Sequence, residues 1–146
     1  MTGPIGPLSS PGFWLQRAAQ TYLRELDARL RPLELTHTQF QLLASAGWLG
    51  RDGEHPTQQQ VADFAGADRM MTSKVLATLE GRGLLVRSAD GQDARLRRVA
   101  ITAPARELLV AATRTARDVD AALFGNDGAL RDRLAAIAGV RDPVGL

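Results

Sequence analysis

The sequence predicts a mainly α-helical protein of about six helices with one small β-hairpin. In most segments, apolar residues recur at three- and four-residue intervals, which is the period of a helix. Glycines that can end a helix follow several of these segments, at Gly66, Gly83 and Gly139. Two short strand-like runs are the exception. They lie on either side of a polar turn that contains glycine, as is typical of a hairpin.

The first helix is expected to follow a flexible N-terminal arm. Residues 1–12 are rich in proline, glycine and serine and are not expected to form a helix. From Phe13 to Pro32 the apolar pattern is helical. Thr36 can cap a second helix, which ends near Gly50.

The next two helices lie close together in the sequence. Thr57 and Gln60 can form a capping box at the start of a short third helix, because each side chain can bond the backbone N–H of the other residue. Gly66 can end that helix in a left-handed conformation, and Asp68 can cap a fourth helix after a turn of about three residues. The fourth helix ends at Gly83. Two helices joined by so short a turn are a candidate helix-turn-helix.

The hairpin and two further helices complete the chain. Strands are expected at residues 84–88 and 96–102. A long helix begins at Thr102, with Pro104 in its first turn, where the missing N–H of proline does no harm. A last helix is expected over residues 129–138.

Length and composition favour one compact domain over residues 13–146. The chain has 146 residues, of which 45% are hydrophobic, and this suffices for one core. It contains no cysteine, which excludes a disulfide framework and thiolate metal sites. No run approaches the roughly 18 apolar residues of a membrane span, and no secretion signal is visible. We therefore expect a cytoplasmic protein with no membrane partner.

No catalytic or metal-binding constellation is visible. An enzyme would need a nucleophile with a base, an acid and base in one cleft, or metal-ligand spacing. The two histidines, His37 and His55, are far apart, and no cluster of carboxylates supports a metal site. We expect neither catalysis nor a cofactor. The net charge of +2 does not by itself suggest a nucleic-acid partner.

The order of the elements is nevertheless that of a winged helix-turn-helix over residues 36–102. The second helix of the pair can enter the major groove of duplex DNA, where each base pair presents its own pattern of donors and acceptors. The first helix can offer its N-terminal N–H groups to a phosphate. The candidate DNA-binding residues on the two helices are Thr57, Gln58, Arg69, Met70, Ser73, Lys74 and Thr78.

The hairpin supports the same interpretation. From Arg82 to Arg98, five arginines stand against two aspartates, which leaves a net charge of +3 (five minus two) on a short element. An arginine at the tip of a wing suits the narrow minor groove, whose negative potential attracts a guanidinium group. Asp93 can hold the Arg95 side chain by a charge-assisted hydrogen bond. The candidate DNA-binding residues of the hairpin are Asp93, Arg95, Arg97 and Arg98.

Four motifs in this region resemble those of a known family. They are Ala65-Gly66-Ala67-Asp68-Arg69, Leu79-Glu80-Gly81-Arg82-Gly83-Leu84-Leu85, Asp93-Ala94-Arg95 and Val99-Ala100-Ile101-Thr102. Over about residues 36–119, the chain resembles the MarR (multiple antibiotic resistance regulator) family of winged helix-turn-helix regulators. The resemblance implies that helices over residues 13–32 and 103–140 form a dimerisation region.

The resemblance also implies a function. It implies a homodimeric transcriptional repressor that binds a pseudo-palindromic operator in double-stranded DNA. Arg95 would enter the minor groove, while Ser73 and Lys74 would lie in the major groove. The chain departs from the family pattern at Met70-Met71, Thr78 and Ala105. We therefore expect an atypical operator preference and phosphate grip.

Many members of the family bind small aromatic acids or drugs between the winged part and the dimerisation helices. The resemblance therefore implies a small aromatic effector that relieves repression. The residues that qualify by position for such a ligand pocket are Trp14, Tyr22, His37, Phe40 and Trp48. Aromatic residues at helical spacing are more often core or dimer interface than ligand contacts. An alternative on the same fold is a dimeric interaction protein that does not bind DNA, although the wing arginines argue against it.

Overall fold

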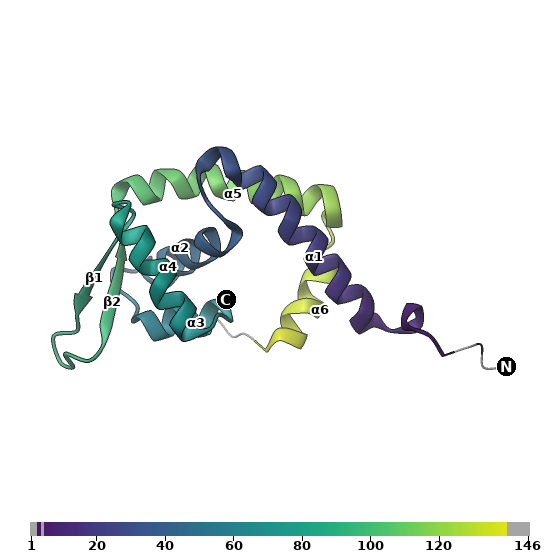
Figure 1. Cartoon of the computed structure of the whole chain (residues 1–146), viewed down its shortest axis with the longest axis horizontal. Helices are drawn as coiled ribbons and strands as arrows, with labels where there is room; N and C mark the ends of the chain where they lie inside the picture. The colour runs from purple at the N-terminus through teal and green to yellow at the C-terminus, as the bar shows by residue number, and fades with distance from the viewer. Residues whose placement is uncertain (1–2, 4, 140–146) are drawn as a thin grey trace.

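The computed structural model describes residue 3 and residues 5–139, and it shows a set of helices with one protruding hairpin (Figure 1). Within these residues the helices are α1 (Pro11–Leu30), α2 (His37–Leu49), α3 (Gln58–Ala65), α4 (Arg69–Gly81), α5 (Ala103–Phe124) and α6 (Gly128–Ala138), and the strands are β1 (Leu85–Ala89) and β2 (Arg97–Ile101). Two short 3-10 helices, η1 (Pro7–Ser9) and η2 (Arg31–Leu33), lie on either side of α1. The predicted fold class is confirmed. Residues 1, 2 and 4 of the predicted arm, and residues 140–146 at the end of the predicted domain, lie outside the described residues.

The first helix begins earlier than the sequence predicted. Ser10 caps α1, since its side-chain oxygen accepts a hydrogen bond from the backbone N–H of Phe13. Pro11 can stand in the first turn because an N–H there has no helical partner in any case. Ahead of it, Pro7–Ser9 forms a single 3-10 turn. The expectation that no helix precedes Phe13 is therefore wrong.

Side-chain caps set the boundaries of the helix-turn-helix. Thr36 and Thr57 each form a capping box, at the start of α2 and of α3 respectively. Gly66 ends α3 with a φ of 67°, a left-handed conformation that glycine adopts without strain. The Asp68 carboxylate then accepts a hydrogen bond from the backbone N–H of Met71 and caps α4. These predicted boundaries are confirmed.

The two strands form one antiparallel pair, in register from Leu85 with Ile101 to Ala89 with Arg97. At the open end of this hairpin, the Thr102 side chain donates to the backbone carbonyl of Gly83 over 2.7 Å. Beside it, the backbone N–H of Val99 donates to the carbonyl of Pro56, just before α3. The base of the hairpin is thus fixed to both helices of the helix-turn-helix.

One hydrophobic core joins the end of α1, α2, α3, α4, the hairpin base and α5. Its largest fully buried apolar side chains are Leu30, Leu42, Leu43, Leu76, Leu79, Leu85, Val61 and Val99. Burying each of these leucines contributes about 1.5–3 kcal/mol relative to exposure. Because Leu76 and Leu79 belong to α4, this core fixes which face of α4 is turned to solvent.

The other end of the molecule is packed differently. α6 buries none of its residues, and its Leu134 and Ile137 side chains are exposed, the latter by 72%. Trp14 and Leu15 of α1 and Leu123 of α5 are exposed as well. In Figure 1, α6 and the first half of α1 lie at the opposite end of the molecule from the hairpin. None of the described helices has the length and apolar character needed to span a membrane.

Candidate nucleic-acid interface and an adjoining groove

The two faces of α4 differ as the sequence predicted. Thr72, Leu76 and Leu79 are buried, and Val75 is half-buried beside them. The opposite face consists of exposed or half-buried side chains, namely Arg69, Met70, Ser73, Lys74, Ala77 and Thr78. An exposed helix face of this width, with donors and apolar groups together, has the dimensions and chemistry that the major groove accepts.

The side chains on this exposed face are held to different degrees. Arg69 Nη2 lies 3.3 Å from Asp63 Oδ2 of α3, in an exposed ion pair. The Thr78 hydroxyl donates to the carbonyl oxygen of Lys74 over 3.3 Å. The Lys74 side chain makes no hydrogen bond or ion pair with the described residues, and Met70 is 75% exposed. Lys74 and Met70 are therefore the least constrained groups on the face.

Arg87 ties the hairpin to both helices. Its Nε and Nη2 atoms lie 3.4 and 3.3 Å from Glu80 Oε1 of α4, and its Nη1 donates to Gln58 Oε1 of α3 over 3.1 Å. The same Nη1 donates to the Ser73 carbonyl over 3.4 Å. Arg87 is one of the five arginines of the wing, yet the structure pairs it and half-buries it. This contact between α3, α4 and β1 was not predicted.

The Glu80 carboxylate takes part in two kinds of bond with Arg87. The backbone N–H of Arg87 donates to Glu80 Oε2 over 2.8 Å, in addition to the side-chain contacts. That backbone hydrogen bond, with the side-chain bond and charge of Arg87, holds the pKa of Glu80 below its ordinary value despite partial desolvation. Arg87 therefore keeps Glu80 ionised, and Glu80 in turn holds Arg87 in place.

At the start of α3, the expectation that backbone N–H groups meet a phosphate is wrong for Thr57. Thr57 is buried, and its backbone N–H already donates to Gln60 Oε1 over 2.8 Å. That N–H is therefore not available for a phosphate. Gln58 is half-buried, and its side chain accepts from Arg87. The Thr57 side chain caps α3 and the Gln58 side chain holds Arg87 in place.

The tip of the hairpin presents Arg95 to solvent. Asp93 Oδ1 accepts from the backbone N–H of Arg95 over 3.0 Å and lies 3.3 Å from its Nε, as the sequence predicted. The Arg95 side chain is nevertheless 91% exposed. Because Asp93 constrains the start of the side chain and leaves the rest of the guanidinium group in solvent, Arg95 is directed outward and able to bind.

The two other candidate DNA-binding arginines of the hairpin differ, since one is exposed and one is fixed. Arg97 is exposed on β2. Arg98 Nε donates to Asp90 Oδ1 over 3.1 Å, and its Nη1 donates to the carbonyl of His55 over 2.8 Å. The side-chain hydrogen bond from Arg98 holds the pKa of Asp90 below its ordinary value, although desolvation opposes this. Arg98 thus fastens the hairpin to the loop before α3.

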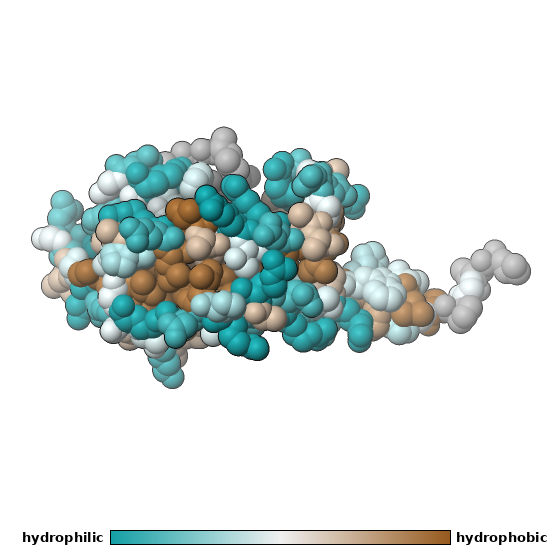
Figure 2. Space-filling view, turned by 90° about the horizontal axis from the view of Figure 1, so that it is seen from above, coloured by the Kyte–Doolittle hydropathy of each residue, from teal (hydrophilic) through white to brown (hydrophobic). Residues whose placement is uncertain are grey.

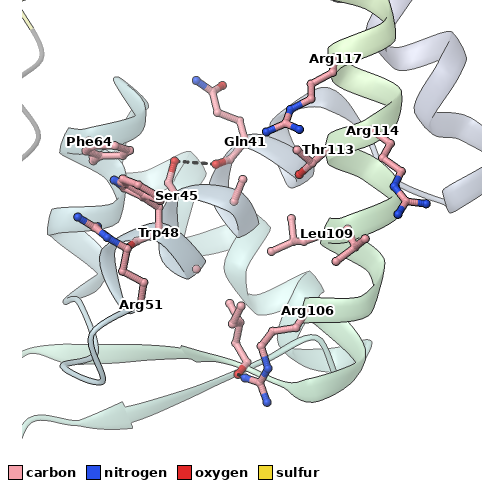
Figure 3. A pocket seen from close by; sticks show the side chains of 14 residues that line it. Gln41, Ser45, Trp48, Arg51, Phe64, Arg106, Leu109, Thr113, Arg114 and Arg117 are labelled. Atoms are coloured by element: carbon pink, nitrogen blue, oxygen red, sulfur yellow. Dashed lines mark hydrogen bonds between the residues drawn. The ribbon is translucent and has the colours of Figure 1, made fainter. Parts of the chain in front are cut away.

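A groove of about 940 Å³ lies between α2 and α5 (Figure 3). One wall is formed by α2 and α3 with Trp48 and Phe64, and the other by α5 with Leu109 and Val110. Figure 3 shows Arg117 and Thr113 pointing from α5 toward Gln41 of α2. In Figure 2, the face seen from above, which α5 crosses, has an apolar area bordered by hydrophilic residues.

Only Trp48 among the five residues predicted for a ligand pocket lines this groove. The Trp14 indole N–H donates to the carbonyl of Leu8, near the start of α1, and the Tyr22 ring packs 5.9 Å from that of Phe124. His37 Nδ1 lies 2.8 Å from Asp27 Oδ2. Phe40 packs against the core. The structure therefore does not bring the predicted set together, because these side chains serve local packing and helix contacts.

Most residues of the groove were missed by the sequence analysis. The α5 residues Arg106, Val110, Arg114 and Arg117 recur at intervals of three and four, so they share one face of a helix. That face is separate from the buried face with Ala105, Ala112, Ala116 and Val119. A stripe of arginines beside the buried stripe was the signal in the sequence that could have indicated the groove.

Comparison with known proteins gives the same assignment in sequence and in structure. Residues 35–96 match the model of the MarR family. The chain is 38% identical over 119 residues to the HTH-type transcriptional regulator YdcH of Bacillus subtilis, covering 82% of this chain and 81% of that protein.

Two solved structures are similar over nearly the whole chain. CouR from Rhodococcus jostii RHA1, bound to p-coumaroyl-CoA, superposes with a TM-score of 0.80 at 26% identity, covering 92% of this chain and 96% of that one. The transcriptional repressor CouR bound to a 23-mer DNA duplex superposes with a TM-score of 0.76 at 30% identity, covering 94% and 99%. These similarities, together with a helix-turn-helix followed by a hairpin, show that this chain belongs to the MarR family.

Proposed function

We propose that this protein is a homodimeric transcriptional repressor that binds duplex DNA, with α4 in the major groove and the hairpin tip in the minor groove. The observation that carries the proposal is the pair of outward-facing surfaces on one fixed unit: the exposed face of α4 and the exposed Arg95. Arg87 joins β1 to α4, so the two surfaces keep a set spacing. The similar repressor CouR, at 30% identity, has been solved on a DNA duplex.

Each candidate residue then has a distinct task. Lys74 and Arg69 supply donors for guanine or phosphate, and Met70 supplies an apolar group for a thymine methyl. Ser73 and Thr78 offer hydroxyls on the same face, and Arg97 adds a phosphate contact along β2. Thr57, Gln58, Asp93 and Arg98 hold these groups in position rather than meeting the DNA themselves.

Dimerisation is supported by the unpacked end of the molecule. A helix as short as α6 is marginal by itself in water, so its exposed apolar residues need a partner surface. A second copy with the same exposed residues on α1 and α6 is self-complementary under two-fold symmetry. Two copies would present two α4 helices to adjacent turns of a pseudo-palindromic operator.

The proposed role is binding and not catalysis. Among the described residues, no group of three or more His, Cys, Asp or Glu side chains could hold a metal ion. The groove between α2 and α5 would serve as an effector site, whose occupation changes the orientation of α4 relative to α5. The similar protein CouR has been solved with p-coumaroyl-CoA bound. We propose that it acts in the cytoplasm, on the duplex DNA that it binds.

Replacing Lys74 with alanine tests the recognition surface. If Lys74 reads a base, Lys74→Ala should cost about 1–3 kcal/mol of binding to DNA from the upstream region of its own coding sequence and should change sequence preference. Fluorescence anisotropy with that duplex and a random duplex measures both quantities. Arg31→Ala is the charge-matched control, since Arg31 is exposed at the end of α1 and its side chain makes no hydrogen bond or ion pair with the described residues.

If Lys74→Ala and Arg31→Ala bind both duplexes as the wild type does, α4 is not a recognition helix. A wild-type protein with no preference for its own upstream DNA over random duplex would instead support a dimeric interaction protein that does not bind DNA.

A substitution on α6 tests the dimer. Ile137→Asp places a charge at a side chain that is exposed in one chain and that we expect to be buried between two chains. We expect a dimer for the wild type and a monomer for Ile137→Asp at micromolar concentration, measured by size-exclusion chromatography with light scattering. DNA affinity should fall when dimerisation is lost, because one half-site holds one protomer weakly. A wild-type monomer, or an Ile137→Asp dimer as tight as the wild type, would contradict the proposed assembly.

A further inference from the structure

The chain passes between its dimerisation helices and its winged part at two places. The first is the connection of residues 31–36, which leads from α1 to α2, and the second is Thr102, which leads from β2 to α5. α1 and α5 also contact each other, where the Tyr22 ring packs on that of Phe124, but both helices belong to the predicted dimerisation region. The two connections are therefore where the chain attaches the dimerisation region to the part that carries α4.

The three residues that follow α4 are bonded to both connections. Arg82 Nη1 donates to the carbonyl oxygen of Glu34, in the first connection, over 2.7 Å. The carbonyl of Gly83 accepts from the Thr102 hydroxyl over 2.7 Å, and the carbonyl of Leu84 accepts from the backbone N–H of Thr102 over 3.1 Å. This short segment thus joins the end of α4 to both of the places where the dimerisation region is attached.

The Arg82 side chain starts from a fixed backbone. The backbone N–H of Arg82 donates to the carbonyl of Thr78 over 3.2 Å, and that of Leu84 donates to the carbonyl of Leu79 over 3.0 Å. The Leu84 side chain is buried in the core. A hydrogen bond from a charged guanidinium group is stronger than one between neutral groups. Because the backbone of Arg82 cannot shift without α4, its side chain relates the position of α4 to that of Glu34.

Glu34, which accepts this bond, has an unusual backbone. Its φ of 56° is left-handed, and it is the one residue other than glycine with a positive φ in the part of the chain that the structure describes. This conformation is unfavourable for a residue with a side chain, and it persists where the surroundings impose it. The backbone N–H of Glu34 donates to the carbonyl of Arg31 over 2.9 Å, and the next residue, Leu35, is buried in the core. A fixed turn therefore directs the Glu34 carbonyl toward Arg82.

A second pair of residues fixes the same connection from the side of α1. Asp27 Oδ1 accepts from the backbone N–H of His37, the first residue of α2, over 2.7 Å, and Asp27 Oδ2 lies 2.8 Å from His37 Nδ1. Although desolvation alone would raise it, these hydrogen bonds hold the pKa of Asp27 below its ordinary value. Asp27 thus binds the end of α1 to the start of α2, while Arg82 binds the connection to α4.

The length of α1 magnifies any change at this connection. The helix has 20 residues, so it is about 30 Å long, and its buried side chains, Leu26 and Leu30, lie near its end. Apolar contacts such as these are not directional, so they do not by themselves fix the angle of the helix. A change of about 10° at the connection would move the start of α1 by about 5 Å.

We propose that Arg82, through its bond to the Glu34 carbonyl, fixes the angle between α1 and α4 and so sets the half-site spacing that the dimer fits. Arg82 is then a positioning residue and not a wing charge that meets DNA. Two copies of α4, each fixed to its dimerisation region, reach the duplex at a separation that depends on this angle. The statement about spacing rests on the proposed repressor function, whereas the statement about the angle within one chain does not.

The angle is measured within one chain, without DNA. The sequence contains no cysteine, so Gln16→Cys and Gln59→Cys give two defined positions for nitroxide spin labels, on α1 and on α3, and both glutamines are exposed. Labelled protein diluted with an excess of unlabelled protein reports the distance within a chain by double electron–electron resonance, in a monomer and in a dimer alike. We expect one narrow distance distribution for the labelled protein. Arg82→Met keeps the length of the side chain but cannot donate, so it should shift or broaden that distribution by about 5 Å.

Two further variants make the test specific. Arg82→Lys retains a charged donor of similar reach and should restore the narrow distribution. Arg24→Met removes the same charge from α1, where Arg24 bonds only within the helix to Thr21, and should leave the distribution unchanged. All three should keep Tm within about 1–2 °C of the wild type, because both arginines are exposed. The proposal is overturned if Arg82→Met keeps the narrow distribution, or if Arg82→Lys or Arg24→Met changes it as much as Arg82→Met does.

The unlabelled proteins are then titrated with upstream duplexes that have one or two base pairs inserted or removed at the centre of the bound site. We expect the wild type to prefer the native spacing by about tenfold or more. Arg82→Met should bind the native spacing about tenfold more weakly and should discriminate less between spacings. If Arg82 met a phosphate instead, Arg82→Met would bind every spacing more weakly by the same factor, which would contradict the positioning role.

The two measurements separate this inference from the proposed function. A changed distance distribution in Arg82→Met, together with a wild-type protein that binds no DNA, would contradict the repressor function and support the assignment of Arg82 within the chain. Specific DNA binding by the wild type, with an unchanged distribution in Arg82→Met, would contradict the assignment of Arg82 alone.

Discussion

The base and the tip of the hairpin use the same residue type for opposite purposes. At the base, Arg87 and Arg98 keep only 19% and 29% of their side chains exposed, and each is paired with a carboxylate and a backbone carbonyl. At the tip, Arg95 is 91% exposed and held only through its Nε and backbone by Asp93. A count of arginines on a wing therefore overstates the charge available to DNA. An arginine that stabilises the fold differs from one that can bind DNA in its side-chain partners and in its exposure to solvent.

The largest effect should come from the base. Arg87→Ala removes the side-chain bonds to Glu80, Gln58 and the Ser73 carbonyl together, and leaves Glu80 only the backbone N–H of residue 87. We expect Tm to fall by about 5–10 °C, since hydrogen bonds with charged groups are among the stronger ones. DNA affinity should fall as well, because α4 and β1 lose their connection.

Arg97→Ala is the matched control on the same hairpin, because Arg97 is exposed on β2. It should leave Tm within about 1–2 °C of the wild type. Thermal unfolding followed by circular dichroism gives both values. Similar Tm values for Arg87→Ala and Arg97→Ala would mean that the paired and the exposed arginines of the hairpin do not differ in the way described.

The next effect should be confined to DNA binding. Arg95→Ala removes an exposed guanidinium group, so we expect unchanged Tm and a loss of DNA affinity of about tenfold or more across sequences. Fluorescence anisotropy on the upstream and random duplexes measures it. An unchanged affinity would show that the tip does not reach the minor groove. A lowered Tm would place Arg95 with the structural arginines.

The smallest effect is a difference in acid sensitivity. The pKa values of Glu80 and Asp90 lie below their ordinary values because of their bonds with Arg87 and Arg98, respectively. The stability that these bonds contribute is fully present when the pH is above the ordinary pKa values, 4.5 for Glu80 and 3.8 for Asp90. It is lost as the pH falls through the lowered pKa values of the two carboxyl groups in the folded protein.

The glutamine of Glu80→Gln has no carboxylate that acid can protonate. The Tm of this variant should therefore fall less than that of the wild type between about pH 5 and pH 3. Thermal unfolding across this range measures the difference, and Asp118→Asn is the control for removal of a carboxylate from an exposed ion pair. An identical decline of all three proteins would show that the pair at Glu80 does not contribute in the folded state.

Local signals in the sequence predicted most of the fold. The caps at Thr36, Thr57 and Asp68 and the left-handed Gly66 depend on residues a few positions apart, so their chemistry is readable along the chain. The start of α1 was misplaced, because proline and glycine were taken as helix breakers where Ser10 in fact supplies a cap.

The candidate site was predictable only in part. The exposed face of α4 and the link from Asp93 to Arg95 follow from helical period and short spacing. The contact of Arg87 with Gln58 spans 29 residues, and the groove combines residues of α2, α3, β2 and α5. Such contacts depend on how elements pack, and no pattern within one element specifies them.

The most direct test of the central proposal is a salt titration of binding to the upstream duplex, with random duplex as competitor. A dimer that neutralises about 6–10 phosphates should lose about 10³–10⁵ in affinity between about 50 and 200 mM salt while still preferring its own site. We predict this steep loss together with retained preference. Binding that is insensitive to salt, or equal for both duplexes at every salt concentration, would contradict a sequence-specific repressor.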